Sequence, residues 1–180
     1  VVLCAMEGTN IVDWMMPKGF VKECRDYYID RAQNNVGLMI PGMIPMRSMI
    51  GDKWLYKNPK AFKGVKNLMD EIHTYGSKVF FQLGTGFAGR NFTFMPFMET
   101  LMDNKALGAL AKPIFNMDAL MVSASDNLPN VWNPDYKTRA LTKDEIDEYI
   151  HAYAEVAYLC KQHGVDGVEV HAVHEGYLLD

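Results

Sequence analysis

The chain has 180 residues, of which 49% are hydrophobic and 22% charged, a balance typical of a globular protein with a sizeable core. The formal net charge of −4 and the lack of a basic run argue against nucleic-acid binding, and no apolar stretch has the roughly 20 residues of a membrane-spanning helix. Cys4, Cys24 and Cys160 form no C-x-x-C pair, so the sequence supports no zinc or iron–sulfur site and favours a reduced, cytoplasmic setting.

The first part of the chain alternates between apolar runs and helical patterns. Residues 1–6 are a short apolar run, typical of a strand buried on both faces. Apolar residues at helical spacing then predict a helix over residues 21–34. Residues 36–40 indicate a second buried strand, and residues 59–75 a second helix, which Gly76 is placed to end.

The alternation resumes after a long irregular stretch. A third strand is predicted over residues 78–83, whereas residues 84–141, rich in Met, Phe, Pro and Asn, show no regular pattern. Thr142 and Glu145 then match a capping box, which predicts the start of a third helix. That helix leads to the fourth predicted strand, residues 165–170.

The two ends of the chain suggest a segment of a longer protein. Val1 opens directly into a predicted core strand, so we expect no signal peptide, and the chain stops at Asp180 without a closing element.

The order β-α-β-α-β-α-β predicts an α/β fold with parallel strands and right-handed crossovers. Periodicity leaves open whether the sheet closes into a barrel or stays open and doubly wound. In both architectures, ligands bind at the carboxyl ends of the strands. Those positions are occupied by residues 7–9, 41–43, 84–86 and 171–177.

The segment after the fourth strand carries most of the reactive side chains, namely His171, His174, Glu175 and Tyr177. An imidazole can donate a hydrogen bond to a carbonyl oxygen, and a phenol with a pKa of about 10 can give its proton to a carbanion. Each residue alone fits a structural role equally well, but the cluster at a strand end favours a catalytic site.

Three glycines after the third strand, Gly84, Gly86 and Gly89, fit the G-x-G-x-x-G dinucleotide pattern. Such a site also needs a helix that opens at the third glycine and an acidic residue about 20 residues further on. Residues 90–96 predict neither, so the pattern does not favour a dinucleotide site.

Several motifs together resemble the Old Yellow Enzyme family, in particular its 2,4-dienoyl-CoA reductase and 2-enoate reductase branch of NADH:flavin oxidoreductases. They are Gln82-Leu83, Ser123-Ala124-Ser125, the stretch from Arg139 to Ile146, Gly-Val-Glu-Val-His from Gly167 to His171, and Gly176-Tyr177-Leu178-Leu179. The likeness extends over nearly the whole chain. It implies an FMN-binding (β/α)8 TIM barrel, with residues 1–180 as its N-terminal half and about the first four β/α units present.

The resemblance also implies where the cofactor binds. Ala5 and Met6 would line the flavin from the first strand, and Gly42 would do so from the second. Gln82 matches the glutamine that pairs with the pyrimidine edge of FMN. Its amide offers one donor and one acceptor, which suit the flavin carbonyl and N–H.

The catalytic roles follow from the same likeness. His171 and His174 match groups that hold the substrate carbonyl, and Tyr177 matches the proton-donating tyrosine. The implied reaction passes hydride from NAD(P)H through FMN to an alkene conjugated to a carbonyl. Long family members carry an iron–sulfur cluster and a second nucleotide domain, for FAD, further along the chain, and a homo-oligomer is compatible with this interpretation.

The chain departs from the family pattern at several positions. Thr85 stands where a histidine is usual, and Ala5 replaces a common proline. Glu175 is an extra residue, which leaves open which histidine meets the substrate. Residues 91–118 have no family counterpart and are expected to shape the substrate pocket.

Two other interpretations remain. Glu169, His171 and His174 are suitable ligands for the metal of a TIM-barrel hydrolase or aldolase, although strand alternation puts only the first two on one face. Alternatively, the half barrel is a non-catalytic binding or scaffold piece. The flavin interpretation needs no metal.

Overall fold

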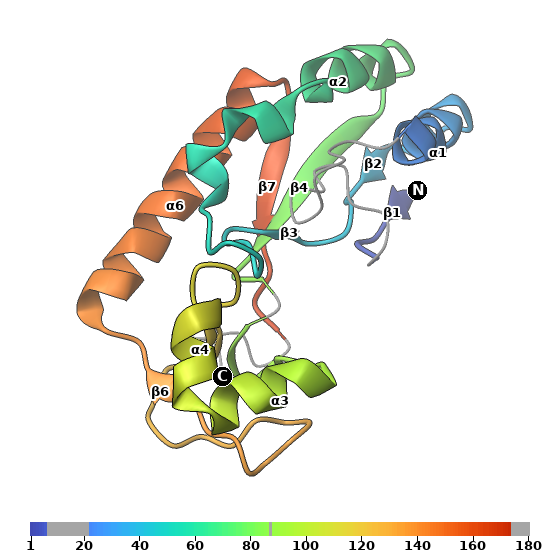
Figure 1. Ribbon diagram of the computed structural model, residues 1–180. Coiled ribbons are helices and arrows are strands. Elements are labelled where there is room, and N and C mark those ends of the chain that lie inside the picture. The colour runs from blue at the N-terminus through green and yellow to red at the C-terminus, as the bar shows by residue number, and fades with distance from the viewer. Residues whose placement is uncertain (7–21, 87, 174–180) are drawn as a thin grey trace. The chain divides into compact units, whose positions relative to one another are not determined.

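The computed structural model describes residues 1–6, 22–86 and 88–173, and its elements follow the predicted alternation (Figure 1). The main series is β1 (Val2–Leu3), α1 (Lys22–Gln33), β2 (Leu38–Met39), α2 (Val65–Thr74), β4 (Lys78–Gly84), α6 (Lys143–Gln162) and β7 (Gly167–Val170). Between them lie strand β3 (Ile44–Pro45) and the 3-10 helices η1 (Leu55–Lys57), η2 (Pro59–Phe62) and η3 (Gly89–Asn91).

The chain divides into two compact units. The first comprises Val1–Met46, Leu55–Gly84 and His151–His171, and the second comprises Arg47–Trp54, Thr85–Ile150 and Ala172–Asp180.

The strands of the first unit form one parallel sheet. β1 pairs with β2, β2 pairs with β4, and β4 also pairs with β3 and β7. Parallel neighbours need long crossover connections, which the helices supply. The carboxyl ends of all these strands therefore lie at the same edge of the sheet.

The helices cover one face of this sheet. On β4, the alternate side chains of Val79, Phe81 and Leu83 are almost completely buried, as expected for the face that packs against helices. α1, α2 and α6 lie along the outer side of the strands in Figure 1. Fully buried apolar residues of α2 and α6 are Val65, Leu68, Met69, Ile72, Ala152, Val156 and Cys160.

The predicted helix boundaries are largely confirmed. Gly76, with φ 77°, lies just beyond the end of α2, as a glycine in the left-handed region would. The capping box is present: the N–H of Glu145 donates to Oγ1 of Thr142 at 3.2 Å, and the N–H of Thr142 donates to Oε2 of Glu145 at 2.9 Å. The strands predicted at residues 1–6 and 36–40 are shorter than expected, since β1 and β2 each have two residues.

The prediction of an irregular stretch over residues 84–141 is wrong. It contains α3 (Pro96–Asp103), α4 (Lys105–Ala111), α5 (Met117–Leu120) and the paired strands β5 (Val122–Ser123) and β6 (Arg139–Ala140). Each helix is shorter than the window over which helical periodicity becomes visible. The local signals are proline at the start of α3 and Asn104, whose side chain accepts hydrogen bonds from Ala106 N–H and Leu107 N–H.

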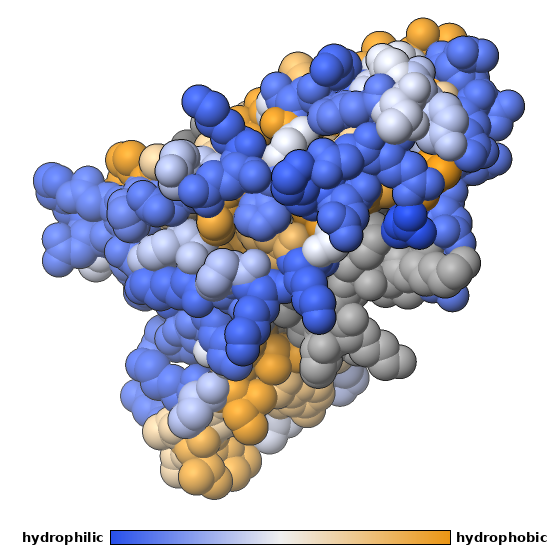
Figure 2. Space-filling model, turned by 90° about the horizontal axis from the view of Figure 1, so that it is seen from above, coloured by the Kyte–Doolittle hydropathy of each residue, from blue (hydrophilic) through white to orange (hydrophobic). Residues whose placement is uncertain are grey.

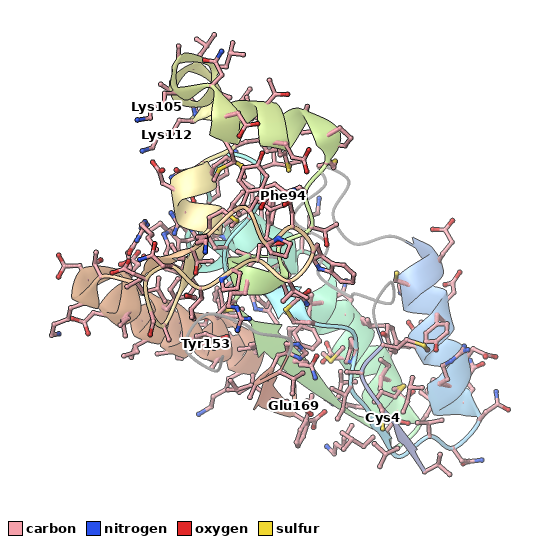
Figure 3. All side chains as sticks on the ribbon, turned by 90° about the horizontal axis from the view of Figure 1, so that it is seen from below. Cys4, Phe94, Lys105, Lys112, Tyr153 and Glu169 are labelled. Carbon is pink, nitrogen blue, oxygen red and sulfur yellow. The ribbon has the colours of Figure 1, made fainter. Side chains whose placement is uncertain are left out.

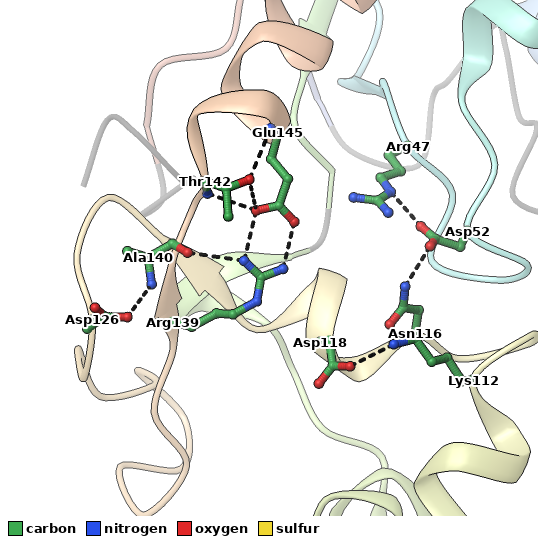
Figure 4. Close-up of polar contacts among 10 residues, drawn as sticks. All are labelled: Arg47, Asp52, Lys112, Asn116, Asp118, Asp126, Arg139, Ala140, Thr142 and Glu145. Carbon is green, nitrogen blue, oxygen red and sulfur yellow. Dashed lines mark hydrogen bonds and ion pairs between the residues drawn. The ribbon is translucent and has the colours of Figure 1, made fainter.

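Two polar networks organise the second unit (Figure 4). The guanidinium of Arg139 donates to both oxygens of Glu145, at 2.8 Å and 2.6 Å, and so ties β6 to the start of α6. In the other network, Asp52 accepts from Nε of Arg47 and from Nδ2 of Asn116, the latter at 2.7 Å.

Helices α3 and α4 carry an exposed apolar surface, which Figure 2 shows as a patch of hydrophobic residues. Its exposed members include Phe97, Leu107, Leu110 and Ile114. Lys105 and Lys112 stand at the two ends of α4 (Figure 3). The expectation that residues 91–118 shape the substrate pocket stays a prediction.

Across the described ranges, no helix combines the length and the apolar character that crossing a membrane requires.

Candidate active site

Two polar side chains meet across strands β4 and β7 of the first unit. Gln82 and Glu169 are partners in the register of these strands, and Nε2 of Gln82 donates to Oε1 of Glu169 at 2.6 Å. Gln82 is only 8% exposed, whereas Glu169 is half-buried on β7 (Figure 3). Because partners on parallel strands project from the same face, both lie opposite the helix-covered face that carries Phe81.

His171 stands beside this pair at the carboxyl edge of the sheet. Its N–H donates to the carbonyl oxygen of Leu83 at 2.8 Å. A Cβ added at Gly84 would lie 3.3 Å from Cβ of His171 and 2.2 Å from Sδ of Met43. Only glycine therefore lets the segments that follow β2 and β7 approach the end of β4 this closely.

The other predicted flavin-lining residues follow the neighbouring strands. Ala5 and Met6 come after β1, and Gly42 comes after β2. The N–H of Ile40 donates to the carbonyl oxygen of Leu3 at 2.9 Å, so the pairing of these strands continues toward the three residues. Gly42 is buried, and Met6 is 55% exposed.

The remaining predicted catalytic residues, His174 and Tyr177, lie outside the described residues. The structure thus brings Gln82, Glu169 and His171 to neighbouring positions of one edge, and the roles assigned to Ala5, Met6, Gly42, Gln82, His171, His174 and Tyr177 stay predictions.

The metal-site alternative gains no support. Among the described residues, no group of three His, Cys, Asp or Glu side chains is arranged to hold a metal ion. Glu169, one of the three suggested ligands, has its Oε1 engaged by the Gln82 amide.

The sequence did not reveal the contact between Glu169 and Gln82. Alternation along β7 placed Glu169 on the same face as His171, but which residue of β4 lies opposite depends on the register of two distant segments. The sequence offered two signals for this contact. One predicted strand carries a glutamine near its end, and the following predicted strand carries a carboxylate at a similar distance from its own end.

The Gln82 amide fits the role of a flavin-binding group. One of its N–H bonds is used by Glu169, and within the described ranges its second N–H and its carbonyl oxygen form no hydrogen bond. One donor and one acceptor thus remain at the carboxyl edge, which match the carbonyl and N–H groups on the pyrimidine edge of FMN.

Parallel strands with polar side chains at their carboxyl ends define the α/β class of enzymes that bind ligands at this edge. Solved structures resolve the choice between barrel and open sheet. The chain is similar to Old Yellow Enzyme from Pichia sp., with a TM-score of 0.65, 21% identity and coverage of 98% of this chain and 42% of that chain. It is equally similar to a structure described as TcOYE with pHBA, with a TM-score of 0.65, 24% identity and coverage of 100% and 48%. Old Yellow Enzymes are TIM barrels, so the predicted barrel fold is confirmed.

The chain belongs to the NADH:flavin oxidoreductase / NADH oxidase family, whose model matches residues 11–180. It is 33% identical to cinnamate reductase from Clostridium sporogenes over 89% of this chain and 22% of the relative. It is 26% identical to NADH oxidase from Thermoanaerobacter brockii over 86% of this chain and 21% of the relative. The chain therefore spans about a fifth of these curated relatives and less than half of the solved structures.

Proposed function

We propose that residues 1–180 form the N-terminal half of an FMN-binding barrel in an ene-reductase that uses NAD(P)H to reduce an alkene conjugated to a carbonyl. The observation that supports this most directly is the buried Gln82 amide, which offers a donor and an acceptor at the carboxyl edge of the sheet, next to His171. Family membership supports the same conclusion.

When bound, FMN would supply the redox chemistry, that is, the transfer of hydride from NAD(P)H to the β-carbon of the alkene. The side chains of the chain divide the remaining work. Gln82 holds the pyrimidine edge, and Ala5, Met6 and Gly42 line the ring. An imidazole of His171 or His174 donates a hydrogen bond to the substrate carbonyl, which stabilises the enolate by about 3 kcal/mol.

We assign the proton on the α-carbon to the phenol of Tyr177, since a phenol with an ordinary pKa of about 10 carries a proton at neutral pH. The name of the relative from C. sporogenes suggests an aromatic enoate such as cinnamate as the first substrate to test. An iron–sulfur cluster and FAD would be held by residues outside this chain. Cys4 and Cys160 are free thiols, which supports a reducing, cytoplasmic compartment.

The test replaces Tyr177 with phenylalanine in the FMN-loaded enzyme and follows the flavin absorption by stopped flow. We expect reduction by NAD(P)H to be unchanged, because no phenolic proton is needed there. Reoxidation by cinnamate should slow about 100-fold or more, since a positioned general acid contributes roughly this factor.

Tyr158→Phe is the matched control, because Tyr158 is 58% exposed on α6. A Tyr177→Phe enzyme that reduces cinnamate at the normal rate would refute the assignment of the proton donor. Bound zinc without a flavin absorption band would instead support the metal-dependent hydrolase.

A further inference from the structure

The contact between Gln82 and Glu169 has a defined polarity. A carboxylate accepts hydrogen bonds and donates none, so only the nitrogen end of the Gln82 amide can face Oε1 of Glu169 at 2.6 Å. The bond is charge-assisted, and Gln82 is 8% exposed, which limits competition from water. A neutral amide free to rotate could present either end, and Glu169 removes that freedom.

We propose that Glu169 is a positioning residue that fixes the orientation of the Gln82 amide toward the pyrimidine edge of FMN. This inference rests on the proposed function, because it needs Gln82 to bind the flavin. With the nitrogen held by Glu169, the carbonyl oxygen and the second N–H of Gln82 are presented together in a fixed order. The donor and the acceptor for the FMN edge are then already in place before binding. No free energy of binding is spent on choosing one of two amide orientations.

The carboxylate has a second consequence for the cofactor. FMN gains negative charge when it is reduced, and a negative carboxylate behind the amide opposes that charge in a partly buried site. Glu169 should therefore make the flavin harder to reduce than a neutral side chain of the same size would. A purely structural role for Glu169 predicts no such change in reduction potential.

The substitution Glu169→Gln tests both effects, because a glutamine has nearly the same size but can either accept from the nitrogen of the Gln82 amide or donate to its oxygen. In the FMN-loaded enzyme we expect the dissociation constant for FMN to rise about tenfold, the usual effect of losing one charged hydrogen bond. The reduction potential, measured by anaerobic titration against a reference dye, should become more positive. Glu169→Met, which removes the polar group, should weaken FMN binding at least as much.

Double variants show whether Glu169 acts through Gln82. In a Gln82→Leu background, Glu169→Gln should change the dissociation constant less than twofold, because the amide that it orients is gone. Glu155→Gln, which removes an exposed carboxylate of α6, is the control for a general loss of charge and should leave both measurements unchanged.

The outcomes separate this inference from the proposed function. If Gln82→Leu weakens FMN binding while Glu169→Gln and Glu169→Met leave affinity and potential unchanged, Glu169 does not position the amide and the flavin site stands. If Gln82→Leu binds FMN as tightly as the wild type, the flavin site itself is misplaced and both proposals fall.

Discussion

The carboxylate of Glu145 combines two functions at the start of α6. It accepts a hydrogen bond from the N–H of Thr142, as part of the capping box that begins the helix. It also forms a bidentate ion pair with Arg139. The hydrogen bonds from Arg139 are the main reason that the pKa of Glu145 falls from 4.5 to about 2, against the opposing effect of partial burial. One charged group thus joins the strand β6 to the helix that leads back to the first unit.

The lowered pKa of Glu145 predicts how this junction responds to acid. Because the folded-state pKa lies below the unfolded value, the ionised carboxylate stabilises the junction above about pH 4.5, and this contribution is lost as the pH falls toward 2. The ion pair is partly exposed, so we expect a loss of about 1 to 2 kcal/mol. This loss of stability is measured by hydrogen exchange at the backbone amides of Glu145 and Ile146, after correction for the intrinsic exchange rates.

Glu145→Gln should make this protection nearly independent of pH over the same window. Asp147→Asn, which removes the partner of Lys143 in an exposed pair on the same helix, should leave the pH dependence in place. An unchanged acid response in Glu145→Gln would show that another group is responsible.

At the residue scale, the sequence predicted where residues of the candidate site lie along the strands better than it predicted which side chains bond to one another. Gln82 and His171 could be placed at strand ends because apolar runs mark where strands stop. The hydrogen bond from Gln82 to Glu169 could not be foreseen, because it depends on a register that joins residues 87 positions apart.

At the scale of elements, Gly167 illustrates how a small residue on one strand makes room for an aromatic side chain on the neighbouring strand. It is the register partner of Phe80, and a Cβ at Gly167 would lie 2.7 to 2.9 Å from three atoms of the Phe80 ring. The ring therefore lies directly over the glycine. This arrangement lets an aromatic residue fill the sheet face that carries Gln82 without separating β4 from β7.

Gly167→Ala should destabilise the protein by about 1 to 3 kcal/mol, because the added methyl group forces the Phe80 ring away from its site. Urea unfolding measures the change, and adding Phe80→Leu should recover much of it. Gly37→Ala is the matched control, since its nearest neighbour would be the carbonyl oxygen of Val1 at an ordinary 3.7 Å. Equal stability of the Gly167 and Gly37 variants would contradict the packing argument.

The length of each helix determined whether the sequence predicted it. Helix α6 has 20 residues and a capping box, so its periodicity and its start were both visible. Helices α3, α4 and α5 have 8, 7 and 4 residues, and tertiary contacts rather than long apolar stripes fix them. The apolar run of residues 1–6 is longer than β1, which has two residues.

At the scale of the whole molecule, three strands in the sheet of the first unit pair with a single neighbour within the described residues. β1 pairs with β2, whereas β3 and β7 both pair with β4. Val168 and Val170 of β7, at 39% and 56% exposure, lie on the face that helices cover elsewhere in the sheet. Unpaired strand edges and uncovered valines are what a closed barrel would pair and bury.

The open edges predict how the isolated chain treats its cofactor. Residues 1–180 alone should lose FMN on gel filtration, because the solved structures that the chain resembles are about twice as long. TIM barrels frequently bind a phosphate group at the loops after their last two strands. A longer chain that includes the residues completing the barrel should elute with FMN at a one-to-one ratio, read from the flavin absorption. Any weak binding by the short chain should fall further in Gln82→Leu if it uses the proposed site. Stoichiometric FMN on the short chain after gel filtration would mean that the strands of residues 1–180 suffice, and that the closing half of the barrel is not what holds the cofactor.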